Sequence, residues 1–333
     1  MRAVEFQEYG GPGVLGVVEA DVPEPGPGQV SIDVAYAGVN FADLKARAEG
    51  YRVAGLPYRP GIEVSGRVRA LGAGVEGLAV GQEVAALLQS GAYAEVAVTD
   101  AATVFPLPAG VGLRTAATLP TVLPTAYGLL HTVGRLQPGE NVLVQSAAGG
   151  VGTVAGQLAR AAGAGAVYGV VSSGAKAEHA RAHGYNEVFV SPADAGLAGG
   201  GLEKAVRAAT GGRGVDLALD PVGGDAFRAS LASLAPFGRL ISFGNAASAE
   251  PWRVTQPELF SRMVAVGTFS VLTLAATDPR RLRELAELAF AKVADGTVSL
   301  PVTAEFPLTD AAAAHHLMGS RTSTGKLLLR MEG

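Results

Sequence analysis

The stretch NVLVQSAAGGVG, residues 141–152, joins a short apolar run to a turn dense in glycine. The run is typical of a buried strand, and the segment that follows, GVGTVAGQLARAAGA (residues 150–164), has helical spacing. The spacing Ala147-x-Gly149-x-x-Gly152 at a strand–helix junction is the fingerprint of a dinucleotide site. The alternative interpretation is an ordinary tight turn that binds nothing.

Each position of this turn has a physical role if a diphosphate binds there. Gly149 would let the backbone approach the ligand, and Gly152 would let the helix pack closely on the strand. The N–H groups at the start of the helix, together with its dipole, would hold the negative charge. The residues expected to contact the cofactor here are Ala148, Gly149, Gly150 and Val151.

Strands and helices alternate after about residue 121. AVYGVV (166–171), VDLALD (215–220) and GRLISFG (238–244) read as strands, with helical segments between them. This alternation predicts βαβ units and a doubly wound parallel sheet of the Rossmann type over residues 122–272. The last strand, VAVGTFSV, would lie at the edge of that sheet.

The remainder of the chain, residues 1–121 and 273–333, reads as a second, β-rich domain. VSIDVAYAGV (30–39) alternates as a strand does, and FADLKARAE (41–49) is expected to be a helix with Asp43 on its polar face. A second helix is expected in DPRRLRELAELAFAKVADG, with Asp278 as N-cap and Gly296 as stop. SLPVTAEFPL reads as a strand pair or loop, and GKLLLRM as a strand that returns to this domain.

Composition excludes several functional classes. The 333 residues carry a net charge of −4 without a long basic run, which argues against nucleic-acid binding. There is no cysteine, so disulfides and Cys-ligated zinc or iron–sulfur sites are excluded. Neither a signal sequence nor an apolar run long enough for a membrane is evident, so a cytoplasmic location is expected.

The end of the second expected strand indicates which dinucleotide binds. NAD sites usually carry an Asp or Glu there for the ribose 2′-hydroxyl, whereas this chain has Ser172 and Ser173, with Lys176 one helical turn later. Hydroxyl donors and a cation suit a 2′-phosphate, so NADPH is the predicted cofactor. The alternative for Lys176 is a solvated helix lysine.

The chain resembles the medium-chain dehydrogenase/reductase superfamily, and more closely its zinc-free quinone oxidoreductase branch, which includes zeta-crystallin. The resemblance covers nearly the whole chain and implies a GroES-like catalytic domain beside the Rossmann domain. It rests on these segments: AGVNFADLKARAEGY, PGIEVSGRV, GAYAEVAV, LPTAYGLL, VQSAAGGVG, VVSSGAKAE, DPVGG and STGKLLL.

The resemblance also implies that no metal is bound. In the zinc alcohol dehydrogenases of the superfamily, a Cys ligand occupies the position of Asn40 and a His ligand that of Ile62, before the retained Glu63. Without a metal there is no Lewis acid for an alkoxide. Hydride transfer to a quinone or enone remains, because the negative charge spreads onto a conjugated carbonyl that few donors can stabilise.

Two catalytic candidates follow from the resemblance. Asn40 matches a polar group beside the nicotinamide ribose or the substrate, with a turn-stabilising Asn as the alternative. Tyr51 matches a tyrosine that related enoyl-thioester reductases use in protonation or substrate orientation, with a packed aromatic as the alternative. Arg52 stands where a Pro is common, which puts the path of this loop in question.

Further cofactor contacts are expected from the same resemblance. Thr125 matches a threonine near the nicotinamide phosphate, or else caps a helix, and Lys326 matches a cofactor-contacting lysine, or else lies on a surface strand. Ser191 stands where the family often has a Tyr on the 2′-phosphate. The residues expected after the later strands are Val222, Phe243, Gly244, Asn245, Phe269, Ser270 and Val271.

Alternative functions remain open at this point. An enoyl-thioester reductase would need a basic rim for its carrier, for which Arg52, Arg59 and Arg67 are candidates. A non-catalytic NADPH-binding structural or sensory protein is the third possibility. The family dimerises through the apolar edge strand, so a homodimer with a continuous sheet is expected. The pair His179 and His183, and the pair His315 and His316, are interpreted as structural rather than metal-binding.

Overall fold

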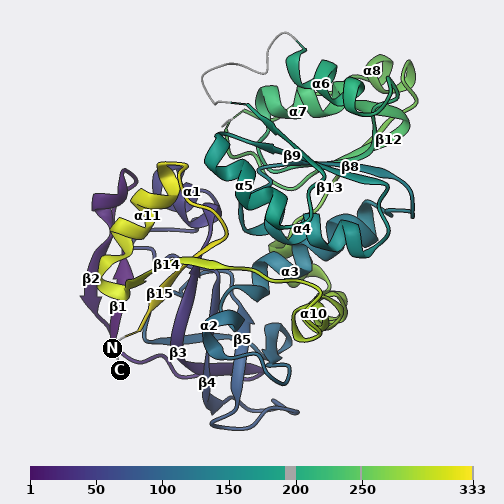
Figure 1. The fold of residues 1–333 in the computed structure, drawn as a ribbon. Coiled ribbons are helices and arrows are strands. Elements are labelled where there is room, and N and C mark those ends of the chain that lie inside the picture. Colours follow the sequence, from purple (N-terminus) through teal and green to yellow (C-terminus); the bar gives the residue numbers. More distant parts are fainter. Residues whose placement is uncertain (192–199, 248–249, 332–333) are drawn as a thin grey trace. The chain divides into compact units, whose positions relative to one another are not determined.

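The computed structural model describes residues 1–191, 200–247 and 250–331 (Figure 1). The chain divides into two compact units. The first unit comprises Met1–Pro124, Val271–Gly296 and Leu300–Gly333, and the second unit comprises Thr125–Ser270 and Thr297–Ser299.

The second unit is a parallel sheet covered by helices. Within the described residues its six strands have the order β10-β9-β8-β11-β12-β13. Counted from β8 this is the order 3-2-1-4-5-6 of a Rossmann fold. The strands are β8 (Asn141–Gln145), β9 (Ala166–Val171), β10 (Glu187–Val190), β11 (Val215–Asp220), β12 (Leu234–Ser242) and β13 (Ala265–Thr268).

Helices cover both faces of this sheet, as βαβ connections require. Figure 1 shows α4 and α5 on one face and α6 and α7 on the other. The expected alternation and the edge position of β13 are confirmed. The helices are α4 (Gly150–Ala161), α5 (Gly174–Ala182), α6 (Gly201–Ala209), α7 (Gly224–Ala232) and α8 (Gln256–Phe260).

The first unit is built on a larger, mostly antiparallel sheet. Its strand order is β14-β15-β3-β4-β5-β7, with β6 paired to β3, and β1 pairs with β2 separately. The strands are β1 (Arg2–Glu5), β2 (Gly16–Glu19), β3 (Gln29–Val39), β4 (Glu63–Leu71), β5 (Glu83–Leu87), β6 (Val96–Asp100), β7 (Val104–Pro106), β14 (Val302–Pro307) and β15 (Lys326–Arg330).

The helices of the first unit are α1 (Phe41–Glu49), α2 (Leu113–Ala116), α9 (Val271–Thr277), α10 (Pro279–Ala294) and α11 (Ala311–Gly319), and α3 (Leu119–Tyr127) crosses into the second unit. The cap of α10 is as expected, since the Asp278 side chain accepts a hydrogen bond from the Arg281 N–H. The strand that returns to this unit is confirmed as β15. It lies antiparallel to β3, with Leu327 opposite Val39.

Two expectations need correction. Asp43 does not lie on an exposed face of α1, because its side chain is buried and accepts a hydrogen bond from the Asn40 N–H at 2.8 Å. The segment 299–308 is not a strand pair. Val302–Pro307 forms the single strand β14, because its backbone pairs in parallel with β15 and not with a second strand in the same segment.

Candidate active site

The glycine turn follows β8 and starts α4. Ser146 adopts a left-handed backbone at φ 54°, and the Ala147 N–H then donates to Val170 O on the neighbouring strand. Gly149 is the N-cap of α4, so the N–H groups of the next residues open the helix without helical partners of their own. The turn therefore presents main-chain donors at the carboxyl end of β8.

The two glycines of the turn differ in the space around them. A Cβ at Gly152 would lie 2.3 Å from Ser146 O and 2.7 Å from the Ala147 Cα, both of them backbone atoms. A Cβ at Gly149 would meet only Ser146 O, at 3.4 Å. Gly152 is thus required for close packing of strand and helix, while the space in front of Gly149 is open.

The residues expected at a 2′-phosphate gather at the ends of β9 and β10. Ser172 and Ser173 follow β9, and Ser173 is the N-cap of α5 without using its hydroxyl as the cap. Lys176 lies in the first turn of α5. Ser191 follows β10, and its N–H donates to Val171 O, which sets it beside Ser172. The four residues therefore lie at the ends of two neighbouring strands, and β9 is next to the strand that leads into the glycine turn.

The turns after β11 and β12 are joined by hydrogen bonds. The Asp220 carboxylate accepts from the N–H groups of Val222 and Gly223 at 3.0 Å, and burial raises its pKa to about 6. The Ala246 N–H donates to Pro221 O across the two turns. This brings Val222 together with the expected residues Phe243, Gly244 and Asn245.

The residues after β13 lie against the end of α3. The Phe269 ring packs so closely on Gly128 that a Cβ there would lie 2.5 Å from the ring. Gly128 begins a π-helical segment, Gly128–Val133, one turn after the buried Thr125. Phe269 thus packs against the helical segment that carries Thr125, one turn further along. Ser270 ends the long segment of the second unit, and Val271 begins α9 in the first unit.

Asn40 is held by a buried ion pair in the first unit. Lys326 Nζ lies 2.5 Å from Glu63 Oε1 and donates to Asn40 Oδ1 at 2.8 Å, and Asn40 Nδ2 donates to Glu63 Oε1 at 2.8 Å. Strand pairing brings the three together, because Asn40 follows β3 while Glu63 opens β4 and Lys326 opens β15.

The ammonium of Lys326 is fully engaged by this cluster. Its third hydrogen bond goes to Val39 O at 3.0 Å, and the residue is only 2% exposed. An ammonium has three N–H donors, and all three now have acceptors in the first unit. A contact of Lys326 with the cofactor stays a prediction, and the structure gives this side chain a different set of partners.

A chain of buried polar groups backs α1. Arg47 can only donate, so its contact at 3.2 Å makes His315 Nδ1 the acceptor and leaves the proton on Nε2. Nε2–H then donates to Tyr93 Oη at 3.0 Å, and the Tyr93 hydroxyl donates to Asp43 Oδ2 at 3.3 Å. Burial lowers the pKa of His315 to about 3 and raises that of Asp43 to about 7.

Tyr51 and Asn40 lie at opposite ends of α1. Asn40 precedes the helix and Tyr51 follows Gly50 at its end, a span of roughly 16 Å at 1.5 Å per residue. Tyr51 is exposed. Arg52 has φ 58°, a backbone conformation that proline cannot adopt, so the loop here differs from one carrying Pro.

The candidate basic rim is mostly neutralised. Arg59 pairs with Glu5 at 2.6 Å, and Arg67 pairs with Glu83 at 2.5 Å. Arg52 instead donates to the neutral Gln89 Oε1 at 3.1 Å. Of the three arginines, it alone has no carboxylate partner among the described residues.

His179 and His183 each make a polar contact within the second unit. His179 Nε2 contacts the Thr153 hydroxyl at 2.9 Å, and His183 Nδ1 contacts the carbonyl of His179 at 2.6 Å. Over residues 1–191, 200–247 and 250–331, no group of three His, Cys, Asp or Glu side chains could hold a metal ion. Nor does any helix in the described part of the chain have the length and apolarity to cross a membrane.

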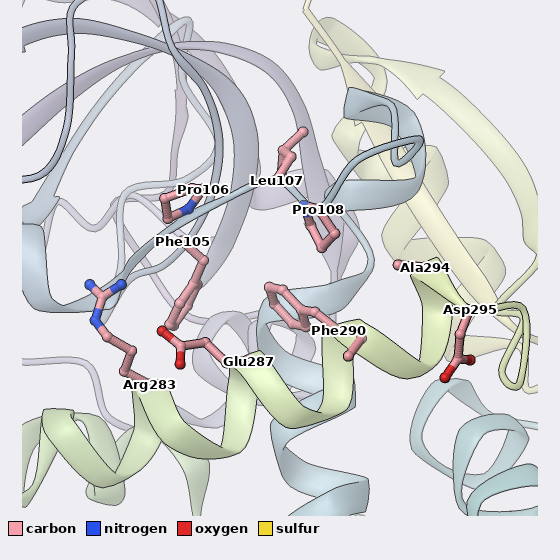
Figure 2. Close-up of a pocket in the computed structure, with 10 residues that line it drawn as sticks. Phe105, Pro106, Leu107, Pro108, Arg283, Glu287, Phe290, Ala294 and Asp295 are labelled. Atoms are coloured by element: carbon pink, nitrogen blue, oxygen red, sulfur yellow. The ribbon is translucent and has the colours of Figure 1, made fainter.

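A pocket of about 660 Å³ lies elsewhere, between the β7 segment and α10 (Figure 2). Figure 2 shows the Phe105 and Phe290 rings and the carboxylate of Glu287 on its walls. Arg283 also lines it, but donates to the carbonyls of Ala101 and Val104. None of the expected site residues lines this pocket.

Sequence reasoning missed both buried networks of the first unit. Glu63 was noted only as a residue kept beside a lost ligand, and Lys326 only as a cofactor contact. A buried Lys and a buried Glu must pair. The available signal was therefore a charged residue at the first position of each of two expected strands, EVSGRV and KLLL.

Two family models match the chain. The model described as an alcohol dehydrogenase GroES-like domain matches residues 26–109, and the model described as a zinc-binding dehydrogenase matches residues 150–291. The first of these segments lies in the first unit, and most of the second segment lies in the second unit.

Individual relatives agree with these models. The quinone oxidoreductase of Pseudomonas aeruginosa is 34% identical over 329 residues, which cover 98% of this chain and 99% of that protein. The structure of Escherichia coli quinone oxidoreductase complexed with NADPH is 31% identical, with a TM-score of 0.91. That match covers 99% of this chain and 100% of the other.

A match of another kind is to a much longer enzyme. A mycocerosic acid synthase-like polyketide synthase of Mycobacterium tuberculosis is 32% identical over 308 residues, or 92% of this chain, but the match spans only 14% of the synthase. The resemblance that covers the full length of both chains is to the quinone oxidoreductases. This chain therefore belongs to the zinc-free quinone oxidoreductase branch of the medium-chain dehydrogenase/reductase superfamily, and it is an oxidoreductase.

Proposed function

We propose that this protein transfers hydride from NADPH to a quinone or an α,β-unsaturated carbonyl without using a metal. The observation that carries the proposal is the group of Ser172, Ser173, Lys176 and Ser191 beside the open face of the glycine turn. Hydroxyls and an ammonium suit a 2′-phosphate, and main-chain N–H groups at a helix start suit a diphosphate. The relatives named quinone oxidoreductase support the acceptor class.

The residues present fit a nicotinamide cofactor. The turn would grip the diphosphate, and Thr125 and Phe269 would form a wall for the nicotinamide. When bound, NADPH supplies the hydride. Asn40 would orient the ribose or the acceptor, and Tyr51 would take part only through a substrate long enough to reach it. The conjugated acceptor spreads the negative charge, so these few donors suffice.

A cofactor titration tests the proposal. NADPH should bind much more tightly than NADH, and Lys176→Ala should reduce this preference by roughly 1.5–3 kcal/mol, the contribution of one charge-assisted hydrogen bond. Lys204→Ala, an exposed lysine on α6, is the matched control and should change neither affinity. Equal binding of both dinucleotides by the unaltered protein would contradict the proposal.

An enoyl-thioester reductase is a second candidate, favoured by the match to the polyketide synthase. The pairing of Arg59 and Arg67 with carboxylates counts against a broad phosphate-binding rim, which leaves Arg52. NADPH oxidation with a quinone and with an enoyl-CoA distinguishes the two reactions. Tight NADPH binding without oxidation by either acceptor would indicate a non-catalytic NADPH-binding protein instead.

We further propose a homodimer through β13. This strand is at the edge of its sheet, where unpaired backbone groups favour pairing with a second strand. Three exposed apolar side chains lie next to it, Phe237 (77%), Phe260 (78%) and Met263 (54%), and the Phe237 N–H donates to Met263 O. Light scattering should give a dimer mass at micromolar concentration, and Phe260→Lys should lower it. A monomer mass for the unaltered protein would contradict the proposal.

A further inference from the structure

The buried ion pair of the first unit holds both ends of one carboxamide. Lys326 Nζ contacts Asn40 Oδ1, and Glu63 Oε1 accepts from Asn40 Nδ2. Turning the amide by 180° would place NH₂ against the ammonium and the amide oxygen against the carboxylate. Both contacts would then be repulsive, so the two charges allow a single orientation of the amide.

The remaining bonds of the pair point into the protein. Glu63 Oε2 accepts from the Thr121 N–H at 2.9 Å, and Lys326 donates to Val39 O at 3.0 Å. Gly38 makes room for the carboxylate, since a Cβ there would lie 2.3 Å from Glu63 Oε1. Glu63 and Lys326 are 0% and 2% exposed, whereas Asn40 is half-buried. Asn40 is therefore the member of this cluster that a ligand can reach.

Stability alone does not account for such a pair. Removing two charges from water costs several kcal/mol per ion, and apolar replacements of similar volume are often as stable or more so. Here the two charged side chains hydrogen-bond to the amide of Asn40 and to backbone groups around it. The charged pair fixes the orientation of the amide, and an apolar pair at the same positions would not.

We propose that Glu63 and Lys326 are positioning residues that hold the Asn40 carboxamide in one orientation for catalysis. This inference rests on the proposed hydride transfer, in which Asn40 contacts the ribose or the acceptor. It assigns to Lys326 an action through Asn40 in place of direct contact with the cofactor.

The test removes both charges together, so that neither is left buried without its partner. In Glu63→Gln/Lys326→Met the shapes are nearly kept and the electrostatic control of the amide is lost. With NADPH and a quinone, kcat should fall roughly 10- to 100-fold, as expected for misplacement of a reacting-site group. The Kd for NADPH should change less than about threefold, because the diphosphate contacts lie in the other unit.

A matched double variant controls for the loss of any ion pair. Arg2→Met/Glu95→Gln removes a pair at 2.7 Å in the same unit, between β1 and the residue before β6, and leaves the contacts of Asn40 with Glu63 and Lys326 in place. It should leave kcat within about twofold. Glu63→Asp, which keeps both charges but draws the carboxylate back from Asn40 Nδ2, serves if the first double variant does not fold, and its kcat should fall at least about fivefold.

A second measurement does not depend on turnover. The side-chain amide protons of Asn40 should exchange slowly with solvent in the unaltered protein and faster in Glu63→Gln/Lys326→Met, as followed by NMR. If none of the quinone or enone acceptors supports oxidation of NADPH by the unaltered protein, the proposed function fails. The amide exchange then decides alone whether the pair fixes Asn40. An unchanged kcat in an active, folded double variant, or an unchanged amide exchange, would overturn the inference.

Discussion

The two units hold their candidate ligand groups in opposite ways. In the second unit, the ends of the parallel strands present main-chain N–H groups and short hydroxyl side chains, with one half-exposed lysine, Lys176. In the first unit, Asn40 is fixed from behind by Glu63 and Lys326, and a further buried chain runs from Arg47 to Asp43. In the second unit the geometry of the candidate site depends on the space around backbone atoms. In the first unit it depends on buried charged side chains.

This contrast predicts how each site tolerates change. A buried charge that loses its partner strongly lowers the free energy of unfolding, because the charge stays out of water without compensation. A main-chain site is damaged only where a new atom meets backbone that cannot move. The largest effects should therefore come from single charge deletions in the first unit, and the smallest from glycine substitutions in the second.

The largest expected effect is that of deleting the buried ammonium. Lys326→Met leaves Glu63 charged and buried, and should lower the free energy of unfolding by about 3–5 kcal/mol in chemical denaturation. The matched change Lys176→Met, at a half-exposed lysine of the second unit, should cost no more than about 0.5 kcal/mol. Equal losses at the two positions would remove the contrast between the units.

The pH dependence of stability provides the next test, through Asp43. Burial raises the pKa of this carboxyl from 3.8 to about 7. The folded state then binds more protons at Asp43 than the unfolded state does, so the contribution of Asp43 to the free energy of unfolding should fall as pH rises from about 4 to about 7. The contribution amounts to roughly 4 kcal/mol over that window.

Asp43→Asn removes this contribution, so the variant should gain stability relative to the unaltered protein as pH rises through the same window. The Tyr93 hydroxyl donates to Asp43 and thereby lowers the pKa of Asp43. Tyr93→Phe removes this hydroxyl, so the pKa of Asp43 should rise further and the window should extend to higher pH. His315 has the opposite sign: its pKa is lowered to about 3, and stability is lost as pH falls below 6.5. A pH-independent difference between Asp43→Asn and the unaltered protein would refute the expectation.

Sequence alone predicted the second unit better than the first. The strand–turn–helix of residues 141–161 is contiguous, so periodicity and glycine spacing could identify it, and Ser191 reaches Ser172 by the regular pairing of adjacent parallel strands. The cluster of Asn40, Glu63 and Lys326 spans 286 residues of separation. Only the pairing of β3 with β4 and β15 brings it together, and the alternation within a strand does not identify its partner strand.

Asp43 shows the same limit on a smaller scale. The helix 41–49 was predicted to the residue, because its pattern is local. The burial of Asp43 was not, because the side chains that cover it, Tyr93 and His315, come from distant segments. Helical periodicity gives the face on which a residue lies, and tertiary contacts decide whether that face is exposed.

The two glycines of the turn allow a comparison within the second unit. Gly152→Ala places a Cβ 2.3 Å from Ser146 O, which is backbone, and should cost roughly 1–3 kcal/mol of stability. Gly149→Ala meets the same atom at 3.4 Å and should leave the thermal midpoint nearly unchanged. It should instead lower NADPH affinity, because the methyl group occupies the space in front of the turn. If Gly149→Ala binds NADPH as well as the unaltered protein, the diphosphate does not lie there.

The smallest expected effect concerns Gly128, where the obstructing group is movable. A Cβ there would lie 2.5 Å from the Phe269 ring tip, and a ring can swing aside where backbone cannot. Gly128→Ala should therefore cost little stability, yet raise the Kd for NADPH by about fivefold, or roughly 1 kcal/mol, as the expected nicotinamide wall shifts. Gly201→Ala, at the start of α6 with no atom within 4 Å of its Cβ, is the control and should leave the Kd unchanged. A large loss of stability without a change in Kd would mean that Phe269 supports the fold and not the cofactor.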